Sequence, residues 1–305
     1  MNMNVSVIVP VYNGTNSLRA LASELERVLS NVAEQYELVL VNDGSSNQCW
    51  SIILELMEKY AWIRGIDLMR NYGQHNATLC GIREAQYEIT VTMDDDLQNP
   101  PAEIPKLLDK LNAGYDVVYG VPQKVREIFW RALASQVIRL VLRRVMGSNV
   151  AWQVSSFRTF RTSIRDAFVE YSSPSVFVDV LLTWGGGRFA AVPVRHDARS
   201  GGESTYTFGK LLGLALNMLT SFSTLPLRFA SMVGFFFTLF GIGVLIYVVG
   251  RYFINGGSIP GFPFLASVIA IFSGATLFAL GIIGEYLARI YIHSMRQPSY
   301  IIRGK

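Results

Sequence analysis

The chain up to residue 122 alternates between short apolar runs and segments with helical spacing. The runs, rich in valine, isoleucine and leucine, cover residues 5–11, 37–42, 63–68, 88–93 and 115–119. The segments expected to be helices cover residues 17–29, 49–60, 76–85 and 104–113. In the first of them, one helical face carries Leu18, Leu21, Leu25 and Val28. Strands that alternate with helices form βαβ units, so the pattern predicts an α/β fold with a parallel sheet.

The pattern changes after residue 122, where basic residues are interleaved with large apolar ones. Residues 124–146 carry six Lys or Arg side chains among Ile, Leu, Val, Phe and Trp. This pattern is typical of an amphipathic helix on a membrane surface, facing anionic headgroups. A helix packed on the sheet with a solvated basic face fits it as well. A helix over 176–184, a strand over 189–194 and a second amphipathic helix over 211–225 are expected to follow.

Two long stretches without any charged residue lie in the last third of the chain. We expect membrane spans at about 229–250 and 264–284, each long enough to cross a bilayer. The turn between them, 255–261, carries no Lys or Arg, whereas several basic residues follow the second span. The positive-inside rule then places both the N-terminal part and the tail in the cytoplasm. Arg251 is the exception, and its long side chain can reach the outer interface.

The overall composition agrees with a membrane protein and excludes several other classes. Half of the 305 residues are hydrophobic and 16% are charged, below the usual quarter of soluble domains. A net charge of +4 is too small to indicate nucleic-acid binding. Two cysteines, Cys49 and Cys80, form neither a disulfide framework nor a zinc motif, and they fit a reducing compartment. We expect no signal peptide before the strand at Val5.

Three consecutive carboxylates, Asp94, Asp95 and Asp96, follow directly on the apolar run 88–93. Unpaired carboxylates at the end of a buried strand repel one another and are costly to desolvate. A hard divalent cation such as Mg²⁺ or Mn²⁺ relieves this, because it prefers carboxylate oxygens together with substrate phosphates. The sequence therefore predicts a metal–diphosphate site at the carboxyl end of this strand, and a solvated acidic turn is the alternative.

Tyr12 and Asp43 follow the first two strands and should share the sheet edge of Asp94. At that edge a tyrosine ring can pack on a base, and an aspartate can accept a hydrogen bond from a base or ribose. Taken alone, an aspartate at this position is more often a turn residue than a ligand. The loop 70–75 opens a helix whose backbone amides can meet a diphosphate, with His75 either involved or simply at the helix start. No Gly-x-Gly-x-x-Gly or Walker motif is present, which disfavours dinucleotide binding and ATP hydrolysis.

Several motifs occur in an order that is specific as a set. They are Val-Pro-Val-Tyr-Asn at 9–13, Val-Asn-Asp-Gly-Ser-Ser at 41–46, Arg-Asn-Tyr-Gly-Gln-His at 70–75, Asp-Asp-Asp-Leu-Gln-Asn-Pro-Pro at 94–101, Arg-x-x-Gly-x-Ser-x-Tyr at 199–206 and Gly-Glu-Tyr at 284–286. With them, the chain resembles family 2 glycosyltransferases of the polyprenyl-phosphate class. That class includes bactoprenol glucosyltransferases, dolichol-phosphate mannose synthases and, most similar here, undecaprenyl-phosphate aminoarabinose transferases. The resemblance covers essentially the whole chain.

The resemblance implies a fold and a role for each part of the chain. The fold is the GT-A fold, a Rossmann-like and mostly parallel sheet, with interfacial amphipathic helices and two transmembrane helices. Residues 1–122 would form the nucleotide-sugar-binding core and 123–228 the acceptor half. Residues 229–291 would form the transmembrane hairpin and 292–305 a cytoplasmic tail. The implied location is the bacterial inner membrane, and relatives suggest a homotetramer.

The resemblance also implies site residues. Metal and donor diphosphate would be held by Asp94, Asp96 and Gln98, with Mg²⁺ or Mn²⁺ as cofactor. The nucleotide sugar would contact Pro10, Tyr12, Asp43, Arg70 and Asp95. The acceptor phosphate would be bound by Arg126, Arg131, Ser135, Arg199, Ser204 and Tyr206, with Arg131 and Arg199 taking part in catalysis. Two departures stand out, because Gly14 replaces a usual glutamate and the segment 152–158 lacks an aspartate that many members carry.

The expected reaction is a single inverting transfer from a nucleotide-diphosphate sugar, with UDP favoured, to a polyprenyl phosphate, with undecaprenyl favoured. The acceptor phosphate is already anionic, so no strong general base is required and the missing aspartate is tolerable. A synthase with a saccharide acceptor is one alternative, but it should show a Gln-x-x-Arg-Trp motif and more spans. The other alternative is a non-catalytic membrane scaffold that binds a nucleotide, and the intact acidic motif disfavours it.

Overall fold

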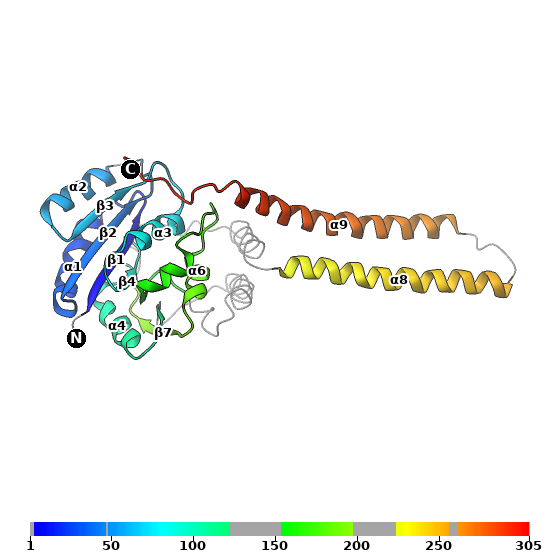
Figure 1. The fold of residues 1–305 in the computed structure, drawn as a ribbon, viewed down its shortest axis with the longest axis horizontal. Helices are drawn as coiled ribbons and strands as arrows, with labels where there is room; N and C mark the ends of the chain where they lie inside the picture. Colours follow the sequence, from blue (N-terminus) through cyan, green and yellow to red (C-terminus); the bar gives the residue numbers. More distant parts are fainter. Residues whose placement is uncertain (1–2, 47, 123–153, 198–223, 256–260, 305) are drawn as a thin grey trace. The chain divides into compact units, whose positions relative to one another are not determined.

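The computed structural model describes residues 3–46, 48–122, 154–197, 224–255 and 261–304 (Figure 1). By its internal contacts the chain forms two compact units, Met1–Leu212 with Arg296–Lys305, and Gly213–Met295. Each unit is described by itself. The amphipathic helices expected at 124–146 and 211–225 lie outside the described residues, apart from the last two positions of the second. The four-part division expected from the sequence stays a prediction.

A seven-stranded sheet forms the centre of the first unit. Its strands are β1 (Asn4–Val11), β2 (Gln35–Asn42), β3 (Ile63–Asp67), β4 (Ile89–Thr92), β5 (Val117–Pro122), β6 (Arg158–Arg161) and β7 (Phe189–Val194). Their order is β3-β2-β1-β4-β6-β5-β7. Strands β1 to β4 pair in parallel, as do β5 and β7, whereas β6 runs antiparallel to both of its neighbours. The prediction of a Rossmann-like, mostly parallel sheet is therefore confirmed.

Helices cover both faces of this sheet (Figure 1). They are α1 (Leu18–Val32), α2 (Cys49–Lys59), α3 (Gln74–Glu84), α4 (Ile104–Asn112) and α6 (Val178–Gly185), with short 3₁₀ segments at Pro101–Glu103 and Thr162–Phe168. Alternate residues of β1 point to opposite faces. Val5, Val7 and Val9 pack into one buried cluster with α1, α2 and α4, while Ile8 packs into another with α3. The helices predicted within the described residues of this unit are present, with ends shifted by a few residues.

Strand β6 was not expected from the sequence. Its four residues, Arg-Thr-Phe-Arg, contain two arginines and no apolar run. It forms because β4 pairs with it on one side and β5 on the other, with Thr92 opposite Arg158. Since β6 is antiparallel, its first residue lies at the carboxyl end of β4. This register brings residues 154–158 next to the acidic motif.

The last residues of the chain also belong to the first unit. Leu68 and Ile302 form an antiparallel bridge, and the N–H of Met69 donates to the carbonyl of Ile301 at 3.0 Å. The N–H of Arg303 donates to the carbonyl of Asp67 at 2.7 Å. The chain therefore returns from its second long helix to the edge of the sheet beside β3.

The second unit consists of two long apolar helices, α8 (Leu225–Asn255) and α9 (Phe262–Ser294). Segments 225–251 and 271–294 have the length and composition to cross a membrane. The helices contact each other through Phe272, whose ring lies 5.7 Å from that of Phe237 and 6.4 Å from that of Phe240, measured between centroids. Large apolar side chains cover the remaining surface, among them Phe236, Ile246, Leu277 and Ile290.

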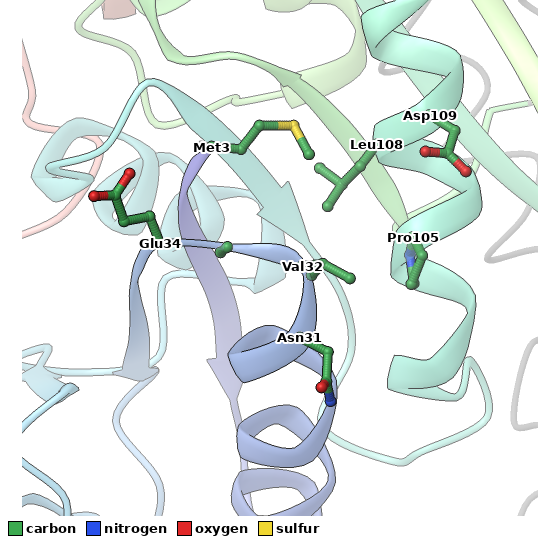
Figure 2. A pocket seen from close by; sticks show the side chains of 8 residues that line it. Met3, Asn31, Val32, Glu34, Pro105, Leu108 and Asp109 are labelled. Carbon is green, nitrogen blue, oxygen red and sulfur yellow. The ribbon is translucent and has the colours of Figure 1, made fainter. Parts of the chain in front are cut away.

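A shallow hollow of about 420 Å³ lies at the amino end of β1 (Figure 2). Met3, the end of α1 and the side chains of Pro105, Leu108 and Asp109 from α4 line it. In a parallel sheet the amino ends lie opposite the carboxyl ends, so this hollow is on the far side from the acidic motif. We assign it no role.

Candidate active site

The loops that follow β1, β2, β3 and β4 meet at the carboxyl edge of the sheet. Strands β2 and β3 extend the sheet on one side of β1, and β4 begins the other side. The chain therefore reverses its direction of growth between β1 and β4, and open α/β sheets bind ligands in the crevice at such a switch point. Tyr12 follows β1 and Asp94 follows β4, so the two predicted residues flank this position.

The loops after β1 and β2 are bonded to each other. The N–H of Asn13 donates to Ser45 Oγ at 3.1 Å, and Asn13 Oδ1 accepts from the N–H of Ser46 at 3.2 Å. Asn13 has a φ of 57°, a conformation that asparagine tolerates better than most residues. This turn leaves the Tyr12 side chain 54% exposed, while Pro10 is buried in the strand. The exposed Tyr12 ring leaves a face open to a planar ligand, and its assignment to the base stays a prediction.

Asp43 is 2% exposed and holds the start of α3. Its two oxygens accept from the backbone N–H groups of Tyr72, at 2.7 Å, and Gly73, at 2.9 Å. Burial raises the pKa of the carboxyl group, and these two hydrogen bonds oppose the rise. The close approach depends on Gly44, because a Cβ there would lie 2.2 Å from the backbone carbon of Arg70. The amides of Tyr72 and Gly73, which we expected to meet a diphosphate, already have a carboxylate partner.

The loop before α3 also carries Arg70, which is exposed. Its guanidinium lies over the ring of Tyr72, 4.8 Å from the centroid. This stacking holds the charged group at the surface beside the β2–α2 loop. Its assignment to the nucleotide sugar stays a prediction.

Asp94 accepts two short hydrogen bonds from outside its own loop. Ser156 Oγ donates to Oδ2 at 2.6 Å, and Gln74 Nε2 donates to Oδ1 at 2.5 Å. Burial raises the pKa of Asp94, and the neighbouring charge of Asp96 adds to the rise. The hydroxyl of Ser156, the positive charge of Arg158 and the amide of Gln74 oppose it. Helix α3 and the entry to β6 therefore fix the orientation of this carboxylate.

Asp95 and Asp96 point in different directions from the same turn. Asp96 Oδ1 accepts from the N–H of Gln98 at 3.1 Å. Leu97, which lies between Asp96 and Gln98, has a φ of 60°. Asp95 lies against the β1–α1 loop, where a Cβ on Gly14 would be 1.8 Å from its Oδ2. In this arrangement a side chain at position 14 and the carboxylate of Asp95 would compete for the same space. That accounts for glycine at the first of the two departures.

A buried ion pair lies directly behind the acidic motif, and sequence reasoning missed it. Arg158 is 2% exposed and Asp179, on α6, is 5% exposed, and the two side chains are paired. Arg158 Nε also donates to Thr92 Oγ1 at 3.0 Å, and Thr92 Oγ1 donates to the carbonyl of Ser156 at 2.7 Å. A run of charged and small residues gave no sign of burial. Two signals were available: Asp179 is the one charged residue of the apolar segment 176–184, and Phe157 and Phe160 flank Arg158 and Thr159.

His75 lies at the start of α3 and packs against Phe177, the residue before α6. Its ring centroid is 4.9 Å from that of Phe177. Burial lowers the pKa of His75, with the charge of Asp179 opposing and that of Arg158 adding to the effect. A neutral imidazole that packs on an aromatic ring agrees with the reading of His75 as a helix-start residue.

The predicted acceptor residues lie outside the described part of the chain. They are Arg126, Arg131, Ser135, Arg199, Ser204 and Tyr206. The described residues just before the glycine-rich motif are next to the acidic loop. The N–H of Asp197 donates to the carbonyl of Gln98 at 2.8 Å, and His196 Nδ1 lies 3.2 Å from Asn99 Oδ1. The chain thus enters the motif at 199–206 from a point bonded to the acidic loop.

Comparison with known proteins identifies the family. The profile described as "Glycosyl transferase family 2" matches residues 6–169. The chain belongs to glycosyltransferase family 2. An undecaprenyl-phosphate 4-deoxy-4-formamido-L-arabinose transferase of Klebsiella pneumoniae (strain 342) is 34% identical over 302 residues, which are 98% of this chain and 92% of that protein. The similarity therefore includes the two apolar helices as well as the sheet.

Solved structures of other transferases share the fold. Glucosyl-3-phosphoglycerate synthase from Mycobacterium tuberculosis, in complex with Mn²⁺, uridine diphosphate and phosphoglyceric acid, matches with a TM-score of 0.53 and 16% identity. The match covers 72% of this chain and 76% of that one. Its complex with Mn²⁺, UDP-glucose and phosphoglyceric acid also gives 0.53, at 14% identity. At these identities the match shows the fold alone, and it agrees with the predicted GT-A fold.

The acidic loop of this transferase has a donor set that fits a divalent cation shared with a substrate. Among the described residues, no group of three or more His, Cys, Asp or Glu side chains is arranged to hold a metal by itself. The charge of Asp96 acts on Asp94, and both residues offer oxygen ligands. Mg²⁺ is commonly bound through one or two carboxylates plus substrate phosphates rather than by an all-protein cage. Asp94 and Asp96, two carboxylates at the switch point, suit a cation that is bound in this way.

Proposed function

We propose that this transferase moves a sugar from a nucleotide-diphosphate donor to a polyprenyl phosphate at a membrane surface. The observation that carries the proposal is the carboxyl-edge site, where exposed Tyr12 and the Asp94–Asp96 loop flank the switch point. Two apolar helices in the same chain support a lipid acceptor. The name of the 34%-identical relative points to the same acceptor class, with undecaprenyl phosphate as its lipid.

The donor would bind across the loops after β1, β2 and β4. Tyr12 would pack on the base, and the Pro10 and Asp43 region would form the wall of the nucleotide pocket. We favour uridine as the base, in line with the resemblance. Asp94, Asp96 and Gln98 would hold Mg²⁺ or Mn²⁺, which when bound supplies positive charge against the departing diphosphate. Hydrogen bonds from Ser156 and Gln74 fix the orientation of Asp94, which supports its assignment as a metal ligand.

The transfer would be a single inverting displacement. An oxygen of the lipid phosphate attacks the sugar C1 from the face opposite the leaving diphosphate, forming one bond while the C1–O bond to the diphosphate breaks. The attacking phosphate is anionic at neutral pH, so the reaction needs no strong general base. Catalysis then depends on positioning and on charge stabilisation. Ser156, rather than a carboxylate, next to Asp94 is compatible with this scheme.

The acceptor phosphate would be bound by arginines from the segments that flank the membrane. Arg126, Arg131 and Arg199 are proposed for this task, because a planar guanidinium donates two parallel hydrogen bonds to phosphate. Ser135, Ser204 and Tyr206 would complete the acceptor site. The bonds from Asp197 to Gln98 and from His196 to Asn99 support a motif at 199–206 that starts beside the donor diphosphate. We further propose an inner-membrane location with the first unit cytoplasmic, and a homotetramer.

The test is to incubate the full chain, in detergent with undecaprenyl phosphate and Mn²⁺, with a panel of UDP- and GDP-sugars. We expect mass spectrometry of the extracted lipid to show one glycosylated polyprenyl phosphate. A product found only in a polymer or a soluble saccharide would favour the saccharide-acceptor alternative. Nucleotide binding without any product would favour the non-catalytic scaffold. Either result would overturn the proposal.

A further inference from the structure

The C-terminal segment 297–303 is fixed along the edge of the sheet next to the nucleotide side of the site. Beyond the bridge between Leu68 and Ile302, Arg303 forms three contacts with the chain after β3. Its N–H donates to the Asp67 carbonyl at 2.7 Å, its Nε lies 2.8 Å from Asp67 Oδ2, and its Nη2 donates to the Met69 carbonyl at 3.3 Å. Arg303 thus holds the residues that immediately precede Arg70.

Apolar and hydroxyl contacts anchor the same segment upstream. Tyr300 packs against the buried clusters on the α3 side of the sheet, and the guanidinium of Arg83 lies 5.7 Å from the centroid of its ring. Ser299 is 4% exposed, and its hydroxyl donates to the carbonyl of Ser173 at 2.8 Å. These contacts place the segment in the fold of the first unit, rather than leaving it as a solvated tail.

A chain of hydrogen bonds continues from Arg303 into the loops of the site. Asp67, which is paired with Arg303 through one oxygen, accepts from Asn42 Nδ2 at 2.7 Å through the other. Asn42 Oδ1 then accepts from the N–H of Ser45 at 3.3 Å. Ser45 in turn accepts from Asn13, the neighbour of Tyr12. The partners come from four separate stretches of sequence, so their alignment depends on each link.

We infer that the segment 297–303 is a positioning element of the donor pocket, acting through Arg303 and Asp67 on the loops after β3, β2 and β1. The inference rests on the proposed function, because it assigns these loops to the nucleotide sugar. Neither residue needs to touch the donor. In the sequence, residues 295 and 296 alone separate this segment from the last residue of α9.

The test compares Arg303→Ala with wild type, using the full chain in detergent. We expect the KM for the nucleotide sugar and the Kd for its nucleoside diphosphate with Mn²⁺ to rise about three- to tenfold, a range typical of losing a partly exposed ion pair and its hydrogen bonds. The KM for the lipid phosphate should stay unchanged. Arg303→Lys should restore part of the loss. The double variant Asp67→Asn with Arg303→Ala should raise the KM for the nucleotide sugar no more than the more severe single variant does. The reason is that the two residues act in one link.

Arg188→Ala is the matched control. Arg188 pairs with Asp116 at 3.4 Å and, like Arg303, also donates to its partner through backbone N–H. This pair lies before β5 and β7, at the amino edge of the sheet. Removal of that arginine should leave both KM values unchanged. Equal changes in donor and lipid KM in Arg303→Ala, or the same donor effect in Arg188→Ala, would overturn the inference.

Hydrogen exchange separates failure of this inference from failure of the proposed function. In Arg303→Ala, amides between residues 67 and 75 should exchange faster than in wild type, and those between 115 and 120 should not. This readout needs neither nucleotide nor turnover. Unchanged exchange at 67–75 would refute the positioning role even if wild type transfers sugar. Faster exchange in a protein that binds no nucleotide would instead refute the proposed function.

Discussion

At the scale of single residues, the three aspartates of the acidic motif have different contacts. Asp94 is oriented by Ser156 and Gln74, Asp95 lies against Gly14, and Asp96 contacts the backbone of its own turn. Asp94 therefore has two of its lone pairs engaged before any ligand arrives.

Asp96→Ala should abolish transfer while the protein stays folded and bound to membranes. The loss should be about a hundredfold or more, because a carboxylate that helps to neutralise the leaving diphosphate acts mainly in the transition state. Initial rates at saturating donor and lipid, with the melting temperature measured in parallel, check this. Asp109→Ala is the control, since Asp109 lies on α4 beside the hollow at the opposite edge. Near-normal rates in Asp96→Ala would refute the metal assignment.

His75 gives a prediction for the dependence of stability on pH. Its pKa in the folded protein is lowered by burial, so the folded state binds fewer protons than the unfolded state below the ordinary histidine value of 6.5. Stability should accordingly fall as the pH drops through that value. His75→Gln should weaken this fall between about pH 7 and about pH 5. Melting temperatures of both proteins across that range provide the measurement, and parallel curves would contradict the assignment.

At the scale of elements, the sequence predicted the parallel half of the sheet and the position of the acidic motif. Repeated apolar runs and helical spacing identified β1 to β4 and their helices, and parallel pairing placed Tyr12, Asp43 and Asp94 at one edge. The sequence did not predict strand β6 or the pairing of the C-terminal segment, because both are short and are stabilised by partners far away in sequence. Asp94 and Ser156 are 62 residues apart, and only the antiparallel register of β6 brings them together.

The buried pair of Arg158 and Asp179 connects β6 to α6. Asp179→Ala would leave the guanidinium of Arg158 buried without its partner, which typically costs about 3 to 5 kcal/mol. Replacing both residues with apolar ones, as in Arg158→Met with Asp179→Leu, should lower the free energy of unfolding by less, because no charge is then left unpaired. Thermal unfolding of the three proteins in detergent checks the order. A double variant less stable than Asp179→Ala would show that the pair itself, rather than the lone charge, sets the cost.

At the scale of the whole molecule, a sugar-transfer fold and two membrane-type helices occur in one chain. The helices expose large apolar side chains such as Phe236, Ile246 and Leu277 over lengths that match a bilayer. Basic residues follow the second helix, and the turn between the helices has none. The positive-inside rule thus predicts that this turn faces the outside and that the first unit faces the cytoplasm.

Cysteine labelling in intact bacteria can decide this orientation. Cys49 and Cys80 are both buried, so the native chain should react little with a membrane-impermeant maleimide. Ser258→Cys places a thiol in the turn between the helices, and it should be labelled in intact cells. Glu58→Cys, at an exposed position on α2, should be labelled only after the membrane is permeabilised. The reverse pattern would place the donor site outside the cell, away from cytoplasmic nucleotide sugars, and would contradict the topology on which the proposed reaction depends.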